Sequence, residues 1–275
     1  MSRALKSALI NVMANAAMRA APRLVRDFGE VEQLQVSKKG PSDFVSTADM
    51  KAEKTILYEL SKARPDFGFL LEEQGERVGD DKSQRWIVDP LDGTTNFLHG
   101  IPHFAISIGL EQEGKIVAGV IFDPIKDEMF WAERGRGAFM NDNRLRVSSR
   151  SDMSQAVLGT GVPHHGRGDH GEFLGIVEEM MKRTMGIRRY GAAALDLAYV
   201  AAGRYEGFWE LDLHPWDLAA GDIIVREAGG YITDYSGRDR AMQSGEVLAA
   251  NDQLHQTLSK IIMKVRKERA AAASE

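Results

Sequence analysis

The stretch Trp86-Ile-Val-Asp-Pro-Leu-Asp-Gly-Thr-Thr-Asn-Phe97 carries the densest chemical signal in the sequence. An apolar run typical of a β-strand leads directly into two carboxylates three residues apart, then into a glycine and two hydroxyls. Strand ends are frequent positions for ligand sites. Because Pro90 stiffens the exit from the strand, we expect Asp89 and Asp92 to converge on one point. The Leu91 carbonyl between them can face the same way, so the stretch predicts a site for a hard cation.

A turn suited to phosphate follows the two carboxylates. Gly93 lets the backbone approach a ligand closely, and the N–H groups of Gly93 and Thr94 would open a short helix. An isolated Asp-Gly-Thr-Thr is more often a simple turn with an N-cap. The complete stretch 86–97 favours adjacent metal and phosphate sites instead.

Two further carboxylates are weak candidates when each is considered alone. Glu72 follows the apolar run 67–71, and a solvated loop explains it better by itself. Asp217 begins an apolar helical pattern, where an interaction with the helix dipole explains it equally well. Their spacing relative to residues 86–97 is what makes both of them candidate metal ligands.

Composition limits the class of protein. The 275 residues are 43% hydrophobic and 27% charged, which is ordinary for a globular protein with a sizeable core. The formal net charge of -5 provides no overall attraction to nucleic acid. The lack of cysteine excludes disulfides, thiolate zinc sites and cysteine nucleophiles. Charged and amide side chains interrupt residues 1–30, so we expect no signal peptide, no membrane association and a cytoplasmic location.

The apolar pattern predicts a mixture of helices and strands, with mostly antiparallel pairing and layers of helices. Helices are expected in the first segment, from 47 to 65, near 171–182 and 192–203, from 217 to 228 and after 251. Strands are expected at 67–71, 86–89, 104–110, 115–124, 127–133, 156–159 and 206–210. The three histidines within 163–170 predict no zinc site, because a glycine-rich loop preorganises ligands poorly.

Taken together, these motifs closely resemble those of the inositol monophosphatase family, and most of all its bacterial branch. The resemblance rests on Glu72-Glu73, on residues 86–97 and on HPWDLAAGDIIVREAGG at 214–230. It extends over KKGPSDFVSTAD at 38–49 and YGAAALDLAYVAAGRYEGFWE at 190–210. It implies an α/β (α+β) fold, a layered αβαβα sandwich of the inositol monophosphatase and fructose-1,6-bisphosphatase type. One domain is expected over 1–275, built from two fused halves, roughly 1–145 and 146–270.

The resemblance also implies roles for individual residues. The metal ligands that it implies, for two or three Mg²⁺ ions, are Glu72, Asp89, the Leu91 carbonyl, Asp92 and Asp217. The catalytic residues that it implies are Glu72 and Thr94, which would orient the attacking water, and Asp49, which would support Thr94. The substrate contacts that it implies are Asp92, Gly93, Thr94, Ala193, Glu210 and Lys38.

Glu210 and Ala192 bear on the choice of alcohol, and Lys38 bears on the phosphate. Glu210 would accept hydrogen bonds from hydroxyl groups of the alcohol and thus favour polyols. Lys38 would complement phosphate, although a surface lysine explains it equally well. Relatives commonly have Ser or Thr after the glycine at Gly191, where this chain has Ala192. The missing hydroxyl leaves the preference among substrates open.

The implied activity is Mg²⁺-dependent hydrolysis of myo-inositol 1-phosphate to myo-inositol and phosphate, in a Li⁺-sensitive homodimer. Histidinol phosphate, fructose 1,6-bisphosphate and 3′-phosphoadenosine phosphates are alternative substrates, because such enzymes share the fold and the motifs. A different alternative is an antitermination factor that associates with RNA polymerase, since bacterial relatives include one. Its candidate surface is Arg183, Arg188, Arg189 and Arg204, which ordinary solvated charge also explains.

Overall fold

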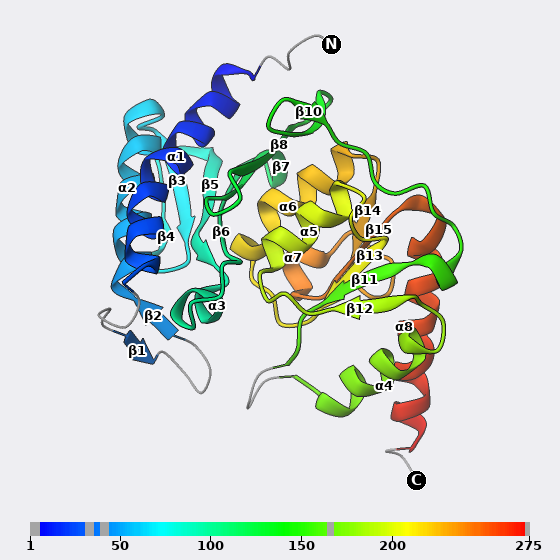
Figure 1. Cartoon of the computed structure of the whole chain (residues 1–275). Helices are drawn as coiled ribbons and strands as arrows, with labels where there is room; N and C mark the ends of the chain where they lie inside the picture. Colours follow the sequence, from blue (N-terminus) through cyan, green and yellow to red (C-terminus); the bar gives the residue numbers. More distant parts are fainter. Residues whose placement is uncertain (1–5, 31–35, 39–43, 164–167, 273–275) are drawn as a thin grey trace.

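The strands form two large sheets and one small one in the computed structural model, which describes residues 6–30, 36–38, 44–163 and 168–272 (Figure 1). The strands of the first large sheet are β3 (Phe67–Leu71), β4 (Gly75–Arg77), β5 (Asp81–Asp92), β6 (Ala105–Gln112), β7 (Lys115–Asp123), β8 (Glu128–Glu133), β9 (Gly137–Met140) and β10 (Asn143–Arg144). Their spatial order is β10-β9-β8-β7-β6-β5-β3-β4. Neighbours in it are antiparallel, except that β3 and β5 run parallel.

The second large sheet has fewer strands than the first and contains both parallel and antiparallel pairs. Its strands are β11 (Val157–Thr160), β12 (Gly186–Arg188), β13 (Gly207–Glu210), β14 (Tyr231–Thr233) and β15 (Val247–Ala250), in the order β12-β11-β13-β15-β14. β11 runs parallel to both of its neighbours, whereas β15 is antiparallel to both of its own. A separate antiparallel pair consists of β1 (Val36–Lys38) and β2 (Phe44–Ser46).

Helices cover the outer faces of both large sheets and fill the space between them (Figure 1). The helices are α1 (Ala8–Phe28), α2 (Thr47–Ala63), α3 (Thr94–Leu98), α4 (His170–Met181), α5 (Ala193–Ala201), α6 (Pro215–Glu227), α7 (Ala241–Ser244) and α8 (Asp252–Ala272). α1 and α2 pack on the first sheet, α5 and α6 lie between the sheets, and α4 and α8 pack on the second sheet. These layers confirm the expected αβαβα sandwich.

The central strand β5 is buried on both faces. Trp86 and Val88 point into the apolar layer beneath α1 and α2, and Ile87 points into the layer that contains α5 and α6. A strand covered on both sides needs apolar residues at every position, which explains the continuous run Trp-Ile-Val. Burial of Ile87 and Val88 stabilises the fold by about 1.5–3 kcal/mol each.

Two glycines let α6 approach the first sheet closely. A Cβ atom at Gly119 would lie 2.7 Å from the backbone oxygen of Ala220, and one at Gly109 would lie 2.7 Å from the Cβ of Ala219. Real Cβ atoms do not approach so near to other atoms, so only glycine fits at these positions. The close packing places the first turn of α6 beside the strands that carry the predicted metal ligands.

The predicted helices and strands are all present, with ends that differ by a few residues except in β5, which begins at Asp81 rather than at residue 86. The sequence patterns did not predict β1, β2, β4, β9, β10, β12, β14, β15, α7 or a 3₁₀ turn at Met153–Gln155. All of these elements have two to four residues, too few for a periodic pattern to emerge. Among the described helices, none is long and apolar enough to cross a membrane.

Candidate active site

A bulge in β5 brings two predicted ligands to the same side of the strand. Asp89 is paired with Ser107 and Asp92 with Ala105, so the two residues between the aspartates oppose a single residue of β6. In a regular strand, residues three apart point to opposite faces, and the extra residue of a bulge corrects this. Pro90 belongs in such a bulge because it has no N–H group to donate to the sheet.

Asp217 completes the carboxylate cluster from the first turn of α6. Asp89, Asp92 and Asp217 each offer one carboxylate oxygen, and these three oxygens all lie within 4.8 Å of one another. Asp217 is fixed by a capping box, in which its Oδ2 atom accepts a hydrogen bond of 2.7 Å from the backbone N–H of His214. Pro215, which favours the first helical position, sets where this helix begins.

Glu72 joins the cluster from the turn after β3. The carboxyl groups of Glu72 and Asp89 are hydrogen-bonded to each other. Burial, followed by the charges of Asp217, Glu73 and Asp49, raises the pKa of Glu72 to about 8, against the lowering effect of the bond with Asp89. Burial and the neighbouring carboxylates also raise the pKa of Asp89 well above its ordinary value. The structure therefore brings the four predicted acidic ligands into one electrostatic cluster.

Such a cluster fits a divalent cation. Buried carboxylates that repel one another must share protons or hold a positive ion. The donors here are oxygen atoms, which suit hard cations such as Mg²⁺ better than metals that prefer nitrogen or sulfur. The pKa values of Glu72, Asp89 and Asp92 are raised because burial and mutual repulsion disfavour their negative charges, which a bound cation would neutralise.

Asp92 also holds the beginning of α5. Its Oδ2 atom accepts a hydrogen bond of 2.8 Å from the backbone N–H of Ala194, and the N-cap residue Ala192 has no side chain that could do so. Burial and the charge of Asp217 raise the pKa of Asp92 to about 7, while the N–H groups of the first turn of α5 oppose this rise. A carboxylate from the segment 89–93, which we call the metal loop, thus acts as the cap of a helix that lies a hundred residues further along the chain.

The turn after Asp92 is tightly packed. Gly93 has a φ of +91°, in the left-handed region, and a Cβ atom there would lie 3.0 Å from the carbonyl oxygen of His103 and 3.2 Å from the Cβ of Ala192. The short helix α3 begins directly afterwards, as predicted. The Thr94 hydroxyl donates a hydrogen bond of 3.0 Å to the Leu91 carbonyl, so the predicted catalytic threonine and the predicted backbone ligand are neighbours.

The cluster opens into a cavity of about 330 Å³. Its wall includes Glu72, Asp92, Gly93, Thr94, Arg189, Ala193, Glu210, Trp216 and Asp217. Burial and the charges of Asp217 and Asp92 raise the pKa of Glu210 to about 8, and Arg189 opposes this rise. The Glu210 carboxyl lies against Gly161, where a Cβ atom would collide with it. The volume is at the lower end of the range for small-molecule sites.

Of the other predicted site residues, Ala193 and Asp49 lie in the described part of the structure, whereas the side chain of Lys38 does not. Ala193 lines the cavity at the start of α5. Asp49 is buried in α2, close enough to raise the pKa of Glu72. Lys38 ends β1, but its side chain lies outside the described part of the structure, so its role stays a prediction. Residues 164–167, which include two of the loop histidines, also lie outside it.

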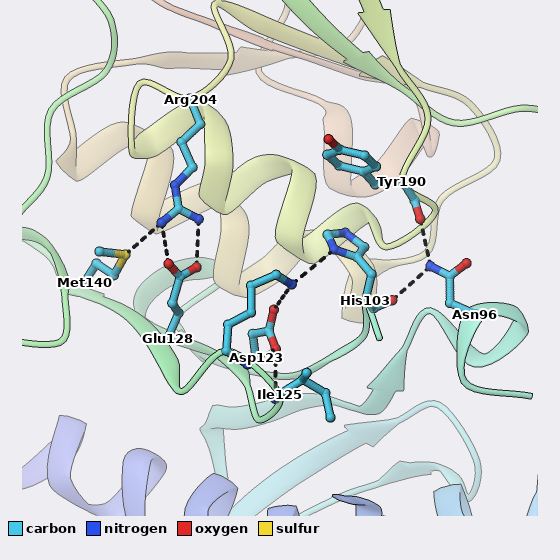
Figure 2. Close-up of polar contacts among 9 residues, drawn as sticks. Asn96, His103, Asp123, Ile125, Glu128, Met140, Tyr190 and Arg204 are labelled. Atoms are coloured by element: carbon cyan, nitrogen blue, oxygen red, sulfur yellow. Dashed lines mark hydrogen bonds and ion pairs between the residues drawn. The ribbon is translucent and has the colours of Figure 1, made fainter. Parts of the chain in front are cut away.

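The four arginines of the candidate protein-binding surface do not share one environment. Arg204 forms a two-pronged ion pair with Glu128, at 2.7 Å for its Nη1 atom (Figure 2). Arg183 pairs with Glu179 at 2.9 Å, and Arg189 lines the cavity. Much of this charge is therefore engaged within the molecule.

Glu53 is a residue that sequence patterns did not single out. It is fully buried in α2, and its carboxylate accepts hydrogen bonds of 2.8 Å from the backbone N–H of Glu73 and 2.7 Å from the Gln74 amide. It therefore fixes the turn that directly follows Glu72. Its spacing of four residues from Asp49 was the available signal, since an acidic pair on the inner face of a helix needs partners.

Comparison with known proteins agrees with this geometry. The model of the inositol monophosphatase family matches residues 5–269. The inositol-1-monophosphatase of Mesorhizobium japonicum is 58% identical over 259 residues, which are 94% of this chain and 97% of that protein. The Nus factor SuhB of Pseudomonas aeruginosa is 42% identical over 254 residues, 91% of this chain and 94% of that protein.

A similar molecule has been solved by crystallography. The extragenic suppressor protein suhB from Bartonella henselae superposes with a TM-score of 0.91 at 57% identity, covering 93% of this chain and 98% of that one. The likeness in sequence and in fold therefore extends over almost the whole chain.

Proposed function

Because the chain belongs to the inositol monophosphatase family, we propose that it hydrolyses myo-inositol 1-phosphate to myo-inositol and phosphate. Membership makes it a phosphatase that hydrolyses phosphate monoesters. The observation that carries the proposal is the meeting of Asp89, Asp92 and Asp217 within 4.8 Å, beside a cavity that also contains Glu210. The relative at 58% identity, which bears the name inositol-1-monophosphatase, supports the choice of alcohol.

We propose Mg²⁺ as the metal. The residues that would hold it are Glu72, Asp89, Asp92, Asp217 and the carbonyl of Leu91. When bound, Mg²⁺ neutralises charge on the phosphate and on the leaving alkoxide. The support for this assignment is a set of donors made only of oxygen, whose carboxylates raise the pKa values of one another.

The chain's own groups then direct an in-line displacement by water. The Thr94 hydroxyl donates to Leu91, which leaves the oxygen of that hydroxyl free to accept a hydrogen bond from the attacking water. Glu72 would accept the other proton of this water, and Asp49 would support Thr94. The bond from the water oxygen to phosphorus forms as the bond to the alcohol oxygen breaks. Glu72 would release the proton taken from the water to solvent, and the leaving alkoxide would take one proton from solvent, so that ester and water give alcohol and phosphate.

Recognition of the alcohol is assigned to Glu210 and Ala193. The Glu210 carboxyl would accept hydrogen bonds from ring hydroxyls, and the Ala193 methyl group would contact the ring. Gly93, Thr94 and Asp92 would face the phosphate side, and Lys38 remains a proposed phosphate contact. We further propose a homodimer and inhibition by Li⁺, both of which follow from the family alone.

A panel of substrates tests this function. Purified protein with Mg²⁺ is offered myo-inositol 1-phosphate, histidinol phosphate, fructose 1,6-bisphosphate and 3′-phosphoadenosine 5′-phosphate, and phosphate release is measured. We expect the highest kcat/KM for the inositol ester, and a Glu210→Gln variant that loses this preference while still hydrolysing simple esters. A higher kcat/KM for another ester would reassign the substrate, and no release from any ester would refute the proposal.

A second function, association with the transcription machinery, is supported by the 42% identical relative that bears the name Nus factor SuhB. An Asp92→Asn variant separates the two roles, because it removes charge from the metal cluster and leaves unchanged Arg183 and Arg204, which pair with Glu179 and Glu128. Retained RNA polymerase binding with lost hydrolysis would favour two independent roles. Absence of RNA polymerase binding by the wild-type protein would contradict the second function and leave the phosphatase activity as the proposed function.

A further inference from the structure

Asn96 connects three segments of the chain that are distant in sequence. Its side chain, 4% exposed, lies in α3 directly after the metal loop. The Nδ2 atom donates hydrogen bonds to the carbonyl oxygens of His103 at 2.9 Å, Tyr190 at 2.7 Å and Gly191 at 3.3 Å. Figure 2 shows the amide between the carbonyls of His103 and Tyr190. One buried amide thus joins the metal loop to the entry of β6 and to the segment that leads into α5.

The segment that leads into α5 forms the alcohol side of the cavity. It carries Arg189 and Ala193, both of which line the cavity. The metal loop holds this segment twice, because Asp92 accepts from the N–H of Ala194 and Asn96 donates to the carbonyls that precede α5. Gly93 lies against Ala192 between these two links. A shift of the metal loop would therefore move the segment that leads into α5, and the reverse also holds.

The two links differ in what else they must do. Asp92 belongs to the carboxylate cluster, so a bound cation competes with α5 for its charge. The Asn96 side chain is neutral and donates to backbone carbonyls, so a cation in the cluster does not compete for its hydrogen bonds. We propose that Asn96 is a positioning residue that holds the alcohol wall of the cavity, the segment 189–195 that leads into α5, in a fixed position relative to the metal loop.

This inference rests on the proposed function only for the choice of substrate. The aspartates of the cluster are held by β5 and α6, which Asn96 does not bond, whereas the wall that carries Ala193 depends on it. Loss of Asn96 should therefore leave chemistry at phosphorus largely intact and loosen binding of the alcohol. A residue needed merely for folding would affect all substrates in parallel.

Asn251 provides a matched control. It is also a buried asparagine, whose amide donates 2.8 Å to the carbonyl of Arg150 and accepts 2.9 Å from the N–H of Leu254, before α8 and outside the cavity lining. Asn96→Ala and Asn251→Ala remove comparable hydrogen bonds from different places. If Asn96→Ala does not fold, Asn96→Ser, which retains a shorter donor, takes its place against Asn251→Ser.

Hydrogen exchange of the metal-free protein tests the link without any substrate. Removal of Asn96 should speed exchange of the amides of residues 193–195 by roughly tenfold, the effect of losing about one hydrogen bond. The Asn251 variant should leave these amides unchanged. Unchanged exchange at residues 193–195 in the Asn96 variant would overturn the proposal, whether or not the protein hydrolyses inositol monophosphate.

Kinetics test the consequence for catalysis. The ratio of kcat/KM for myo-inositol 1-phosphate to that for p-nitrophenyl phosphate should fall roughly tenfold in the Asn96 variant, mainly through KM for the inositol ester. The Asn251 variant should keep the wild-type ratio. Equal losses for both esters in the Asn96 variant, or the same change of ratio in both variants, would contradict the positioning role. If the wild-type protein prefers another polyol ester, that ester replaces the inositol ester.

Discussion

At the scale of single residues, the site depends on carboxylates held close together by groups that are not ligands. The bulge at Pro90 orients Asp89 and Asp92, the capping box orients Asp217, and Glu53 fixes the turn after Glu72. The bulge, the capping box and Glu53 each hold a carboxylate near others of the same charge, against their mutual repulsion. The repulsion predicts how the metal-free protein responds to pH.

Stability of the metal-free protein should fall between pH 6.5 and 8.5. The pKa of Glu72 is raised to about 8 and that of Asp92 to about 7, above the values of an unfolded chain. The folded state thus binds more protons than the unfolded state in this range, so raising the pH removes stability. His103, whose pKa burial lowers to about 4, opposes the effect only near pH 6.5, where the unfolded chain still binds a proton on this ring and the folded chain does not.

Urea unfolding in EDTA at these two pH values measures the change. Saturating Mg²⁺ should reverse the trend, because deprotonated carboxylates bind the cation better at higher pH. An Asp92→Asn variant should show a flatter dependence in EDTA. Constant or rising stability of the metal-free wild-type protein across this range would show that these carboxylates do not repel one another as described.

Glu53→Gln should reduce turnover more than substrate binding. The amide can accept only one of the two hydrogen bonds that Glu53 accepts from Glu73 and Gln74, so the turn that orients Glu72 becomes looser. We expect kcat to fall roughly tenfold, the effect of about one lost hydrogen bond, with little change in KM.

Glu227→Gln is the matched control for this change. Glu227 accepts hydrogen bonds of 2.8 and 2.7 Å from the N–H groups of Gly135 and Gly137, in a turn away from the cavity. Because Glu227 is less buried than Glu53, this variant should lose less thermal stability, and it should keep its kcat. Equal kcat values for the two variants would mean that Glu53 contributes only to folding.

At the scale of secondary structure, the position of α6 relative to the first sheet sets the distance between Asp217 and the aspartates of β5. The packing surfaces are small residues, with Gly109 and Gly119 facing Ala219 and Ala220. Close packing of this kind leaves no room for added volume. A single methyl group should therefore affect both stability and metal binding.

Gly119→Ala should destabilise the protein by about 1–3 kcal/mol, the usual cost of overpacking. Its Cβ would lie 2.7 Å from the backbone oxygen of Ala220, which pushes α6 away and weakens Mg²⁺ binding. Gly207→Ala is the control, because its Cβ would press on Leu258 of α8 at 2.7 Å instead. Chemical unfolding and the Mg²⁺ concentration for half-maximal activity are measured. Unchanged Mg²⁺ dependence in Gly119→Ala would show that α6 does not set the metal site.

The sequence predicted the elements that carry the site because their signals are local. The apolar run at 86–88, the strand before Glu72 and the helix that contains Asp217 each stand within a dozen residues of their ligand. The links made by Glu53 and Asn96 could not be predicted with the same means, since the partners of Glu53 lie 20 and 21 residues away and two partners of Asn96 lie 94 and 95 residues away. Short strands such as β12 and β14 are defined by their neighbours in the sheet rather than by their own three residues.

At the scale of the whole molecule, the layer order places α5 and α6 between two sheets, and both helices begin at the cavity. The metal carboxylates come from the first sheet and from α6, whereas Glu210 comes from the end of β13 in the second sheet. With the residue roles proposed above, phosphate chemistry and alcohol recognition would be contributed by different layers. The order of layers followed from the resemblance to a family, since local patterns do not reveal which face of a sheet a helix covers.

The most direct test is phosphate release from myo-inositol 1-phosphate as a function of Mg²⁺ concentration, in the wild-type protein and in Asp217→Asn. The asparagine can still accept the capping hydrogen bond from His214, so the change removes charge from the cluster and leaves α6 in place. We predict no release in EDTA, Mg²⁺-dependent release by the wild-type protein, and a loss in the variant of roughly a hundredfold or more in apparent Mg²⁺ affinity or in kcat. Equal Mg²⁺ dependence of the two proteins, or release by the wild-type protein in EDTA, would contradict the metal-dependent site.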